Sequence, residues 1–299
     1  GPSASASGWT YRAKDQKENI WVAVKVIDAK LLQTEAERSK FLSALKKASK
    51  VNHPCWTKTL GHGTDRDILY YITPFIDGLS LRKIIDLRAE KRQVFSLAES
   101  TPTFRQLANA LAALKKGDYH GALTPRSLRI LPETLKVSGL AHLKGLPRRP
   151  LIAKHKSIGS NYYLAPEVRD DASDIRPTCD VFSAAVIITE MLTGIIRERD
   201  GLEAWERARD VLDGRLAAAL ERGFGHQPDL VWTKHRGSGA TNPTFTDSVR
   251  GGDKQMGTSS NAAEDSGSHG KISSFDSDGI TVIDGTNGTY PRLYFNSLN

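Results

Sequence analysis

The residues 118-DYHGALTPRSL-128 are the most informative stretch of this 299-residue chain. They follow 103-TFRQLANALAALKKG-117, whose pattern predicts a helix that ends in glycine. The stretch carries His120, Leu123 and Pro125, with small or hydroxyl-bearing residues between them. So short a pattern can arise by chance, and its meaning depends on whether companion motifs occur elsewhere in the chain.

Three companion motifs are present, and their order is fixed. Residues 22-VAVKVI-27 read as a strand that carries Lys25. Residues 159-GSNYYLAPEV-168 and 179-CDVFSAAVIITEMLTG-194 follow the central stretch, and the second reads as a long buried helix. Each motif is weak alone, but four in register are a strong signal.

Together these motifs resemble a protein kinase of the bacterial Ser/Thr type over about residues 8 to 232. The resemblance implies an α+β, two-lobed protein-kinase-like fold with a small β-rich lobe and a large helical lobe. We expect the small lobe at residues 1–77, truncated at its first strand, and the large lobe at residues 78–235. Residues 236–299 are expected to form a Gly/Ser-rich tail: a linker with a candidate β-hairpin or a fragment of a further domain.

The resemblance also implies that the catalytic apparatus is degenerate, as in a pseudokinase. In the kinase pattern H-R-D-L-K-P-x-N, the catalytic Asp falls on Ala122, the Lys on Thr124 and the metal-binding Asn on Ser127. The metal-binding Asp of the D-F-G segment is assigned to Val137, within 135-LKVSGLAHL-143. A methyl group cannot accept a proton, and valine offers no oxygen to Mg²⁺. Phosphoryl transfer depends on positioned charge, so we expect no catalytic residue and no metal site.

A nucleotide site is partly retained in this resemblance. Lys25 matches the phosphate-binding lysine, Ala23 the adenine roof, and the backbone N–H of Ile76 in 73-TPFIDG-78 the adenine donor. Of the glycine-rich pattern G-x-G-x-x-G, only Gly8 remains. No cofactor is therefore expected to be required, and any ATP binding should be weak and independent of Mg²⁺.

The usual acidic partner of Lys25 is also missing. Residues 34–51 have helical periodicity, and the position of the pairing Glu falls on Ala44. Lys25 should then lack a carboxylate, and a surface or loosely paired lysine is the alternative interpretation.

Composition restricts the class of protein. Hydrophobic content of 39% and charged content of 25% are typical of globular proteins. The longest apolar stretch, 181-VFSAAVIITEMLTGII-196, contains Glu190 and favours a buried core helix over a membrane span. Cys55 and Cys179 lie far apart, which favours a reducing compartment and a cytoplasmic location. The opening 1-GPS-3 resembles a protease scar, so we expect the natural protein to extend upstream, where an anchor could lie.

The net charge of +8 is uneven. Residues 246–299 contain four Lys/Arg and seven Asp/Glu, a net −3, so the remainder carries +11. Part of this excess lies in 144-KGLPRRPLIAKHK-156. We predict that Arg148, Arg149 and Lys154 bind a protein partner that is acidic, or that recognises a phosphopeptide; a solvated loop is the alternative. Nearby hydroxyls that could be phosphorylated are Ser157, Ser160 and Tyr162. Nucleic acid is not favoured, because no aromatic residues are interleaved with these basic ones.

The composition changes after about residue 236. Residues 237–279 are rich in Gly, Ser, Thr, Asn and Asp and read as linker or irregular loop. Two strand-like runs, 280-ITVID-284 and 290-YPRLYF-295, are joined by 285-GTNG-288 and predict a hairpin. The neighbouring acidic residues lack the spacing of an EF-hand, so turn chemistry is preferred over Ca²⁺ binding.

Three functions therefore compete. The first is a catalytically inactive pseudokinase that acts in signalling as a protein-binding scaffold or allosteric regulator. The second is a residual or unconventional nucleotide-dependent transferase, which would need a replacement base such as His120, Asp118 or His142. The third is a kinase-derived domain that serves to present the C-terminal segment. For His120, a structural packing role is preferred over catalysis.

Overall fold

The computed structural model describes residues 2–210 and 212–224, together with the backbone of strands at 230–233, 244–247, 256–257, 271–276 and 279–283. Contacts divide the chain into two compact units, Gly1–Leu220 and Glu221–Asn299. This division lies before the boundary at residue 235 that the sequence predicted. The first unit contains both lobes of the predicted fold.

The small lobe is an antiparallel sheet with the strand order β1-β2-β3-β5-β4. Its strands are β1 (Ser3–Ser5), β2 (Gly8–Asp15), β3 (Ile20–Ile27), β4 (Gly61–Asp65) and β5 (Ile68–Pro74). Burial alternates along β5, where Leu69, Tyr71 and Thr73 are buried, as expected for a sheet with one face on a core. The short β1 lies where the sequence predicted a truncated first strand.

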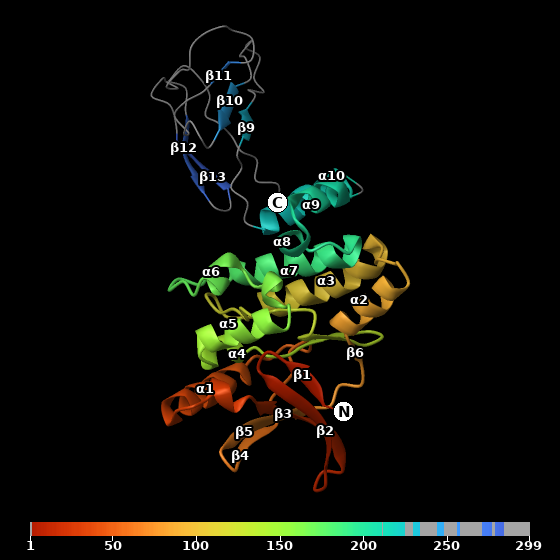
Figure 1. Ribbon diagram of the computed structural model, residues 1–299, viewed down its shortest axis with the longest axis vertical. Helices are drawn as coiled ribbons and strands as arrows, with labels where there is room; N and C mark the ends of the chain where they lie inside the picture. The colour runs from red at the N-terminus through yellow and green to blue at the C-terminus, as the bar shows by residue number, and fades with distance from the viewer. Residues whose placement is uncertain are drawn as a thin grey trace. The chain divides into compact units, whose positions relative to one another are not determined.

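Helix α1 (Glu35–Ala48) lies beside this sheet (Figure 1). Its start is fixed by a capping box, in which the Thr34 hydroxyl accepts from the Glu37 N–H and the Glu37 carboxylate accepts from the Thr34 N–H. Phe41 is fully buried and meets the Tyr71 ring edge-on, with the ring centroids 6.1 Å apart. The helix is thus anchored to β5 through an aromatic contact.

The large lobe is built around helix α7 (Thr178–Thr193), most of whose side chains are buried. The helix ends at Gly194, which has φ +75°, a left-handed conformation that glycine adopts without strain. The core-helix interpretation of this apolar stretch is therefore confirmed. Among the described residues, no helix is both long and apolar enough to cross a membrane.

Other elements surround α7 (Figure 1). A small sheet has the order β6-β7-β8. Its strands are β6 (Leu79–Ser80), β7 (Leu128–Ile130) and β8 (Leu135–Val137). The remaining helices of the first unit are α2 (Leu81–Glu90), α3 (Leu97–Ala112), α4 (His142–Gly145), α5 (Arg148–Ser157), α6 (Pro166–Arg169), α8 (Arg197–Asp200) and α9 (Leu202–Arg209), with short 3-10 turns η1 (Ala29–Leu31) and η2 (Asn161–Tyr163). Helix α10 (Gly214–Gly223) crosses the division between the units.

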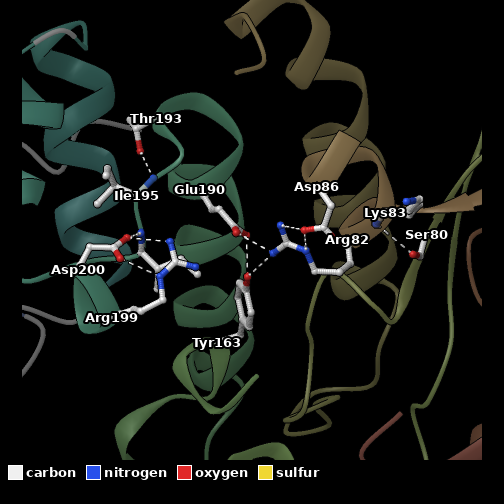
Figure 2. Close-up of polar contacts among 11 residues, drawn as sticks. Ser80, Arg82, Lys83, Asp86, Tyr163, Glu190, Thr193, Ile195, Arg199 and Asp200 are labelled. Atoms are coloured by element: carbon white, nitrogen blue, oxygen red, sulfur yellow. Dashed lines mark hydrogen bonds and ion pairs between the residues drawn. The ribbon is translucent and has the colours of Figure 1, made fainter. Parts of the chain in front are cut away.

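A buried ion pair ties three of these elements together (Figure 2). Arg82 of α2 donates to the Glu190 carboxylate of α7 over 2.7 Å and to the Tyr163 hydroxyl over 3.0 Å. Tyr163 in turn donates to the other Glu190 oxygen over 2.6 Å. Glu190 is 3% exposed, so the pair satisfies a charge that would otherwise be costly to bury.

The described strands of the second unit form two small sheets. One has the strand order β11-β10-β9, formed by β9 (Leu230–Thr233), β10 (Thr244–Asp247) and β11 (Met256–Gly257). The other is a hairpin of β12 (Lys271–Asp276) and β13 (Gly279–Ile283). The strand predicted at 280–284 is thus present, but its described partner precedes it. Three of these strands (β10, β11 and β12) fall in the stretch 237–279 that composition indicated as linker or irregular loop, and the run 290–295 lies outside the described residues.

Candidate functional site

A cleft lies within the first unit, where the β1–β2–β3 side of the small lobe faces strands β7 and β8. Most of the predicted site residues line it. From the small lobe and the segment after β5 come Gly8, Ala23, Lys25 and Ile76, and from the large lobe come Ala122, Thr124 and Ser127. The structure therefore brings the predicted nucleotide and catalytic positions together in one cavity.

The loop that resembles a catalytic loop is held by a carboxylate beneath it. Asp180 at the start of α7 accepts from the backbone N–H groups of His120 and Gly121, over 2.7 and 2.8 Å. Gly121 has φ +72°, a conformation that favours glycine, and a Cβ there would approach the Leu143 side chain to 2.2 Å. On the side of the loop these bonds use backbone N–H groups alone, so they do not depend on which side chains the loop carries.

Both ring nitrogens of His120 have a partner. Its Nε2 lies 3.0 Å from the Ser138 carbonyl, and its Nδ1 lies 3.2 Å from the Ala122 N–H. Nδ1 accepts and Nε2 donates, which is the neutral tautomer, and burial lowers the pKa of His120. The geometry agrees with the packing role that was preferred for His120.

The three loop positions that match catalytic residues in the kinase pattern carry no charge. Ala122 presents a methyl group, and Thr124 is buried. The Ser127 hydroxyl donates to the Thr124 carbonyl over 2.7 Å, so it caps a local turn. None of these side chains supplies a carboxylate to a metal ion or to a substrate hydroxyl.

Val137 is placed differently from its prediction. Side chains alternate along β8, so Leu135 and Val137 point into the core while Lys136 and the following Ser138 line the cleft. Val137 is fully buried and does not line this cleft, although it borders a smaller neighbouring cavity together with Lys25. Ser138 and Gly139 are the residues that follow it, and neither carries a carboxylate.

Lys25 lies in the cleft, so the alternative of a surface lysine is wrong. Its ammonium lies 5.7 Å from the centre of the Tyr71 ring. Burial, and then the charge of Arg129, lower the pKa of Lys25 to about 8. Among the described residues, no ion pair joins Lys25 to a carboxylate.

Ala44 of α1 packs closely against helix α4. Helix α4 lies against α1 at Gly145, and a Cβ there would come within 2.8 Å of Phe41 and 2.9 Å of the Ala44 Cβ. In the same helix His142 is hydrogen-bonded to the Tyr71 hydroxyl over 2.8 Å. Small residues at 44 and 145 thus let the two helices approach closely.

The basic stretch 144–156 is helical rather than a solvated loop. It spans the end of α4 and most of α5, and Leu151 and His155 are buried. Lys154 forms an ion pair with Asp28 over 2.5 Å, and Arg148 pairs with Asp171 over 3.3 Å. Lys154 and Arg148 are therefore engaged within the chain, with side chains 35% and 31% exposed.

Arg149 is the exception, because its side chain remains 87% exposed although it pairs with Asp171 over 2.8 Å. The hydroxyls suggested for phosphorylation differ in access. Ser160 is buried and bonded to His155, Tyr162 is half-buried, and Ser157 is exposed. Of the predicted partner-facing groups, only Arg149 and Ser157 are freely accessible.

The roof of the cleft is a tight hairpin. Gly8 has φ +139°, and a Cβ there would meet the Val26 carbonyl oxygen at 2.1 Å. The turn residues Ala6 and Ser7 are buried, and the Asp28 N–H donates to the Ser7 carbonyl over 2.9 Å. The hairpin is thus tied to the end of β3.

Two cleft residues were not anticipated. Arg129 of β7 and Lys136 of β8 are directly opposite each other in the strand register, and both line the cleft. In the strands 128–130 and 135–137, apolar and basic residues alternate, so Arg129 and Lys136 lie on the opposite face from their apolar neighbours. This alternation in the sequence could have predicted that both face the cleft. Among the described residues, no acidic side chain lines the cleft, and no group of three or more His, Cys, Asp or Glu could hold a metal ion.

This fold and cleft define a protein kinase domain. The protein kinase domain family matches residues 5–201, so the chain belongs to that family. Residues 209–292 match a second family, a domain of unknown function named DUF7483.

The curated relatives match the kinase-like part of this chain. The chain is 27% identical to the serine/threonine-protein kinase PknL of Mycobacterium bovis over 194 residues, which is 63% of this chain and 47% of PknL. It is 23% identical to the probable serine/threonine-protein kinase CPE1738 of Clostridium perfringens, of which it covers 27%. The chain thus spans less than half the length of these relatives.

Solved structures give the same fold. The kinase domain of Mycobacterium tuberculosis PknI superposes with a TM-score of 0.58 at 18% identity, covering 74% of this chain and 84% of that domain. A structure of a point mutant of the same PknI domain gives a TM-score of 0.55 at 20% identity, covering 73% of this chain and 83% of that domain. The predicted α+β fold, with its small β-rich lobe and large helical lobe, is confirmed.

Proposed function

We propose that this chain is a catalytically inactive pseudokinase that acts in signalling as a protein-binding scaffold or allosteric regulator. The observation that carries the proposal is that no carboxylate lines the cleft in the described part of the chain. A kinase needs a base for the substrate hydroxyl and oxygen ligands for its metal ions, and these charges supply most of its acceleration. Ala122 and Ser127 provide neither.

The closed packing of α4 and α5 supports the same proposal. Gly145 against Ala44 and the Lys154–Asp28 ion pair hold the segment after β8 across the small lobe. A surface that is held in one conformation suits a binding role. A cytoplasmic location remains part of the proposal and is supported by the two buried, unpaired cysteines, Cys55 and Cys179.

The test is transfer of radiolabelled phosphate from ATP to the chain itself and to a generic protein substrate. The expected result is no transfer above background with Mg²⁺ or Mn²⁺. Robust transfer that Lys25→Ala abolishes would overturn the proposal and favour the alternative, a residual nucleotide-dependent transferase. That alternative is favoured by the retained Lys25 and by the N–H of Ile76, which has no backbone acceptor among the described residues.

The partner surface is tested separately. Arg149→Glu should weaken capture of a partner from the native host by the intact chain, because Arg149 is the accessible member of the basic group. Arg105→Glu, at an exposed position of α3, makes the same charge change away from α5 and is the matched control. Equal capture by both variants would show that Arg149 does not bind the partner, and residues 236–299 would be the next candidate surface.

A further inference from the structure

The outer side of helix α1 carries positive charge and no negative charge. Helical spacing places six exposed residues opposite the buried Phe41 and Leu45, namely Ala36, Ser39, Lys40, Ser43, Lys46 and Lys47. Lys50 is exposed in the turn that follows the helix. The two acidic residues of α1, Glu35 and Glu37, both lie in its first turn. We call Lys40, Lys46, Lys47 and Lys50 the lysine face.

The lysine face is not neutralised within the described part of the chain. Arg38 of the same helix has a carboxylate partner, Asp67, at 3.7 Å, but no described ion pair reaches any of the four lysines. Lysines in the last turn of a helix complement its dipole, which accounts for Lys46 and Lys47. It does not account for Lys40 in the middle of the helix, so the face has more positive charge than the fold requires.

Two further lysines lie near this face. Helix α4 packs against α1 at Gly145, as Figure 1 shows, and the neighbouring Lys144 pairs with Asp118. Lys115 and Lys116, just before Asp118 in the turn after α3, are exposed and have no ion pair among the described residues. Cations from separate segments of the chain therefore gather around the contact between α1 and α4.

The composition of this surface indicates the kind of partner. All of its unpaired cations are lysines, and no aromatic residue stands on the exposed side of α1. Protein interfaces are depleted in lysine and are anchored by aromatic residues and arginine. Single-stranded nucleic acid is bound with aromatic residues on which its bases stack. An anionic lipid surface needs neither, because it attracts each lysine through charge alone.

We propose that the lysine face docks the chain onto an anionic membrane surface. Clusters of about four to eight basic residues on one helix are sufficient for such attraction. The apolar side of α1 packs within the small lobe, so the contact is electrostatic and reversible and inserts no side chain into the lipid. The inference goes beyond the proposed function, because it concerns where the chain binds and not whether it transfers phosphate.

The experiment is co-sedimentation of the full chain with large unilamellar vesicles. One set consists of phosphatidylcholine alone and the other of equal parts of phosphatidylcholine and phosphatidylserine, each at low and at physiological ionic strength. We expect binding only to the vesicles that contain phosphatidylserine. Salt should weaken this binding severalfold, because counterions screen exposed charges.

Variants locate the surface. Lys40→Gln and Lys47→Gln should each weaken binding to the anionic vesicles about fivefold, the factor expected for one lysine beside such a surface. Lys83→Gln, at an exposed position of α2, makes the same change elsewhere and should leave binding unchanged. Glutamine favours a helix about as well as lysine, and far-UV circular dichroism checks the fold of each variant. Lys47→Arg keeps the charge and should bind like the parent chain.

Three vesicle results overturn the inference: no binding to anionic vesicles at low salt, equal binding to both sets, or binding that neither Lys40→Gln nor Lys47→Gln weakens. A DNA duplex that binds more tightly than the anionic vesicles, and that the same variants weaken, would assign the surface to nucleic acid and overturn it as well. The phosphate-transfer assay separates the two proposals. An active chain that binds the vesicles refutes the proposed function alone, and an inactive chain that does not bind them refutes this inference alone.

Discussion

Gly145 of α4 faces Ala44 of α1 so closely that a Cβ on residue 145 would lie 2.9 Å from the Ala44 Cβ. Position 44 is where the kinase pattern places the Glu that pairs with the strand lysine. The small side chains at 44 and 145 are what allow the two helices to approach so closely.

Substitution of Gly145 tests this contact. Gly145→Ala should lower the free energy of unfolding by about 1–3 kcal/mol, because the added methyl group overpacks Phe41 and Ala44. Helix propensity alone predicts the opposite sign, since alanine favours a helix over glycine by ~1 kcal/mol. Urea denaturation measures the difference. Gly214→Ala in α10, where a Cβ meets nothing within 4 Å, should be neutral or stabilising, and a loss at both positions would refute the packing argument.

Removal of the buried guanidinium should be far more costly than removal of an exposed one. Arg82→Met leaves Glu190 without its cation, so we expect a loss of about 3–5 kcal/mol in unfolding free energy. Arg207→Met breaks an exposed pair with Glu203, whose side chains are 71% and 83% exposed, and should change stability by about 0.5 kcal/mol or less. Thermal or urea unfolding of both variants checks the prediction. Similar losses of stability in both variants would contradict the prediction that Glu190 depends on Arg82 for neutralisation.

Carboxylates restored at two positions should behave differently. Val137 is fully buried, so Val137→Asp should cost about 3–5 kcal/mol, as an uncompensated buried charge does. Ala122 borders the cleft, so Ala122→Asp should leave the urea midpoint much closer to that of the parent chain. Neither variant should transfer phosphate, because catalytic groups that act together are non-additive. A stable and active Val137→Asp chain would contradict the position assigned to this side chain.

Acid should destabilise the fold through its buried histidines. Burial lowers the pKa of His155 to about 4 and holds the pKa of His142 well below its usual value. Below about pH 6.5 the unfolded chain takes up protons that the folded chain excludes, so stability falls as pH drops toward 4. His155→Gln should reduce the difference in unfolding free energy between pH 7 and pH 5 by about 2 kcal/mol. His62→Gln, at an exposed position of β4, is the control and should not change that difference.

Alkali should weaken metal-free ATP binding through Lys25. With a pKa of about 8, Lys25 is mostly charged at pH 7 and mostly neutral at pH 9, so the affinity for ATP in EDTA should fall by up to about tenfold between them. The groups around it are Arg129, Tyr71, His120 and His142, and none changes charge in this interval: the pKa of Tyr71 is raised by burial and those of the histidines are lowered. Calorimetry on Lys25→Arg should show no such fall, and this variant also reports any change in the charge of the ligand.

The sequence predicted those parts of the fold whose signals are local. Strand β3 and helix α7 have compact apolar patterns, and the loop at 118–128 keeps its spacing because Asp180 binds its backbone. Helix α5 was not predicted from the sequence. The ion pairs that hold it join Arg148 to Asp171 and Lys154 to Asp28, and these partners are distant in the chain.

Two features of the cleft could be recognised only once the strand register was known. Val137 was assigned by motif, whereas the alternation of β8 points Lys136 into the cleft and Val137 away from it. Arg129 was overlooked for the same reason, because its importance comes from a neighbour on another strand.

Asp28 connects parts of the cleft that are distant in the chain. Its N–H holds the Ser7 carbonyl of the roof hairpin, and its carboxylate holds Lys154 of α5. We therefore expect the hairpin that contains Ser7 and helix α5 to open together rather than independently. Amide hydrogen exchange in the hairpin and in α5 should share a single rate, and a ligand that fills the cleft should slow both together.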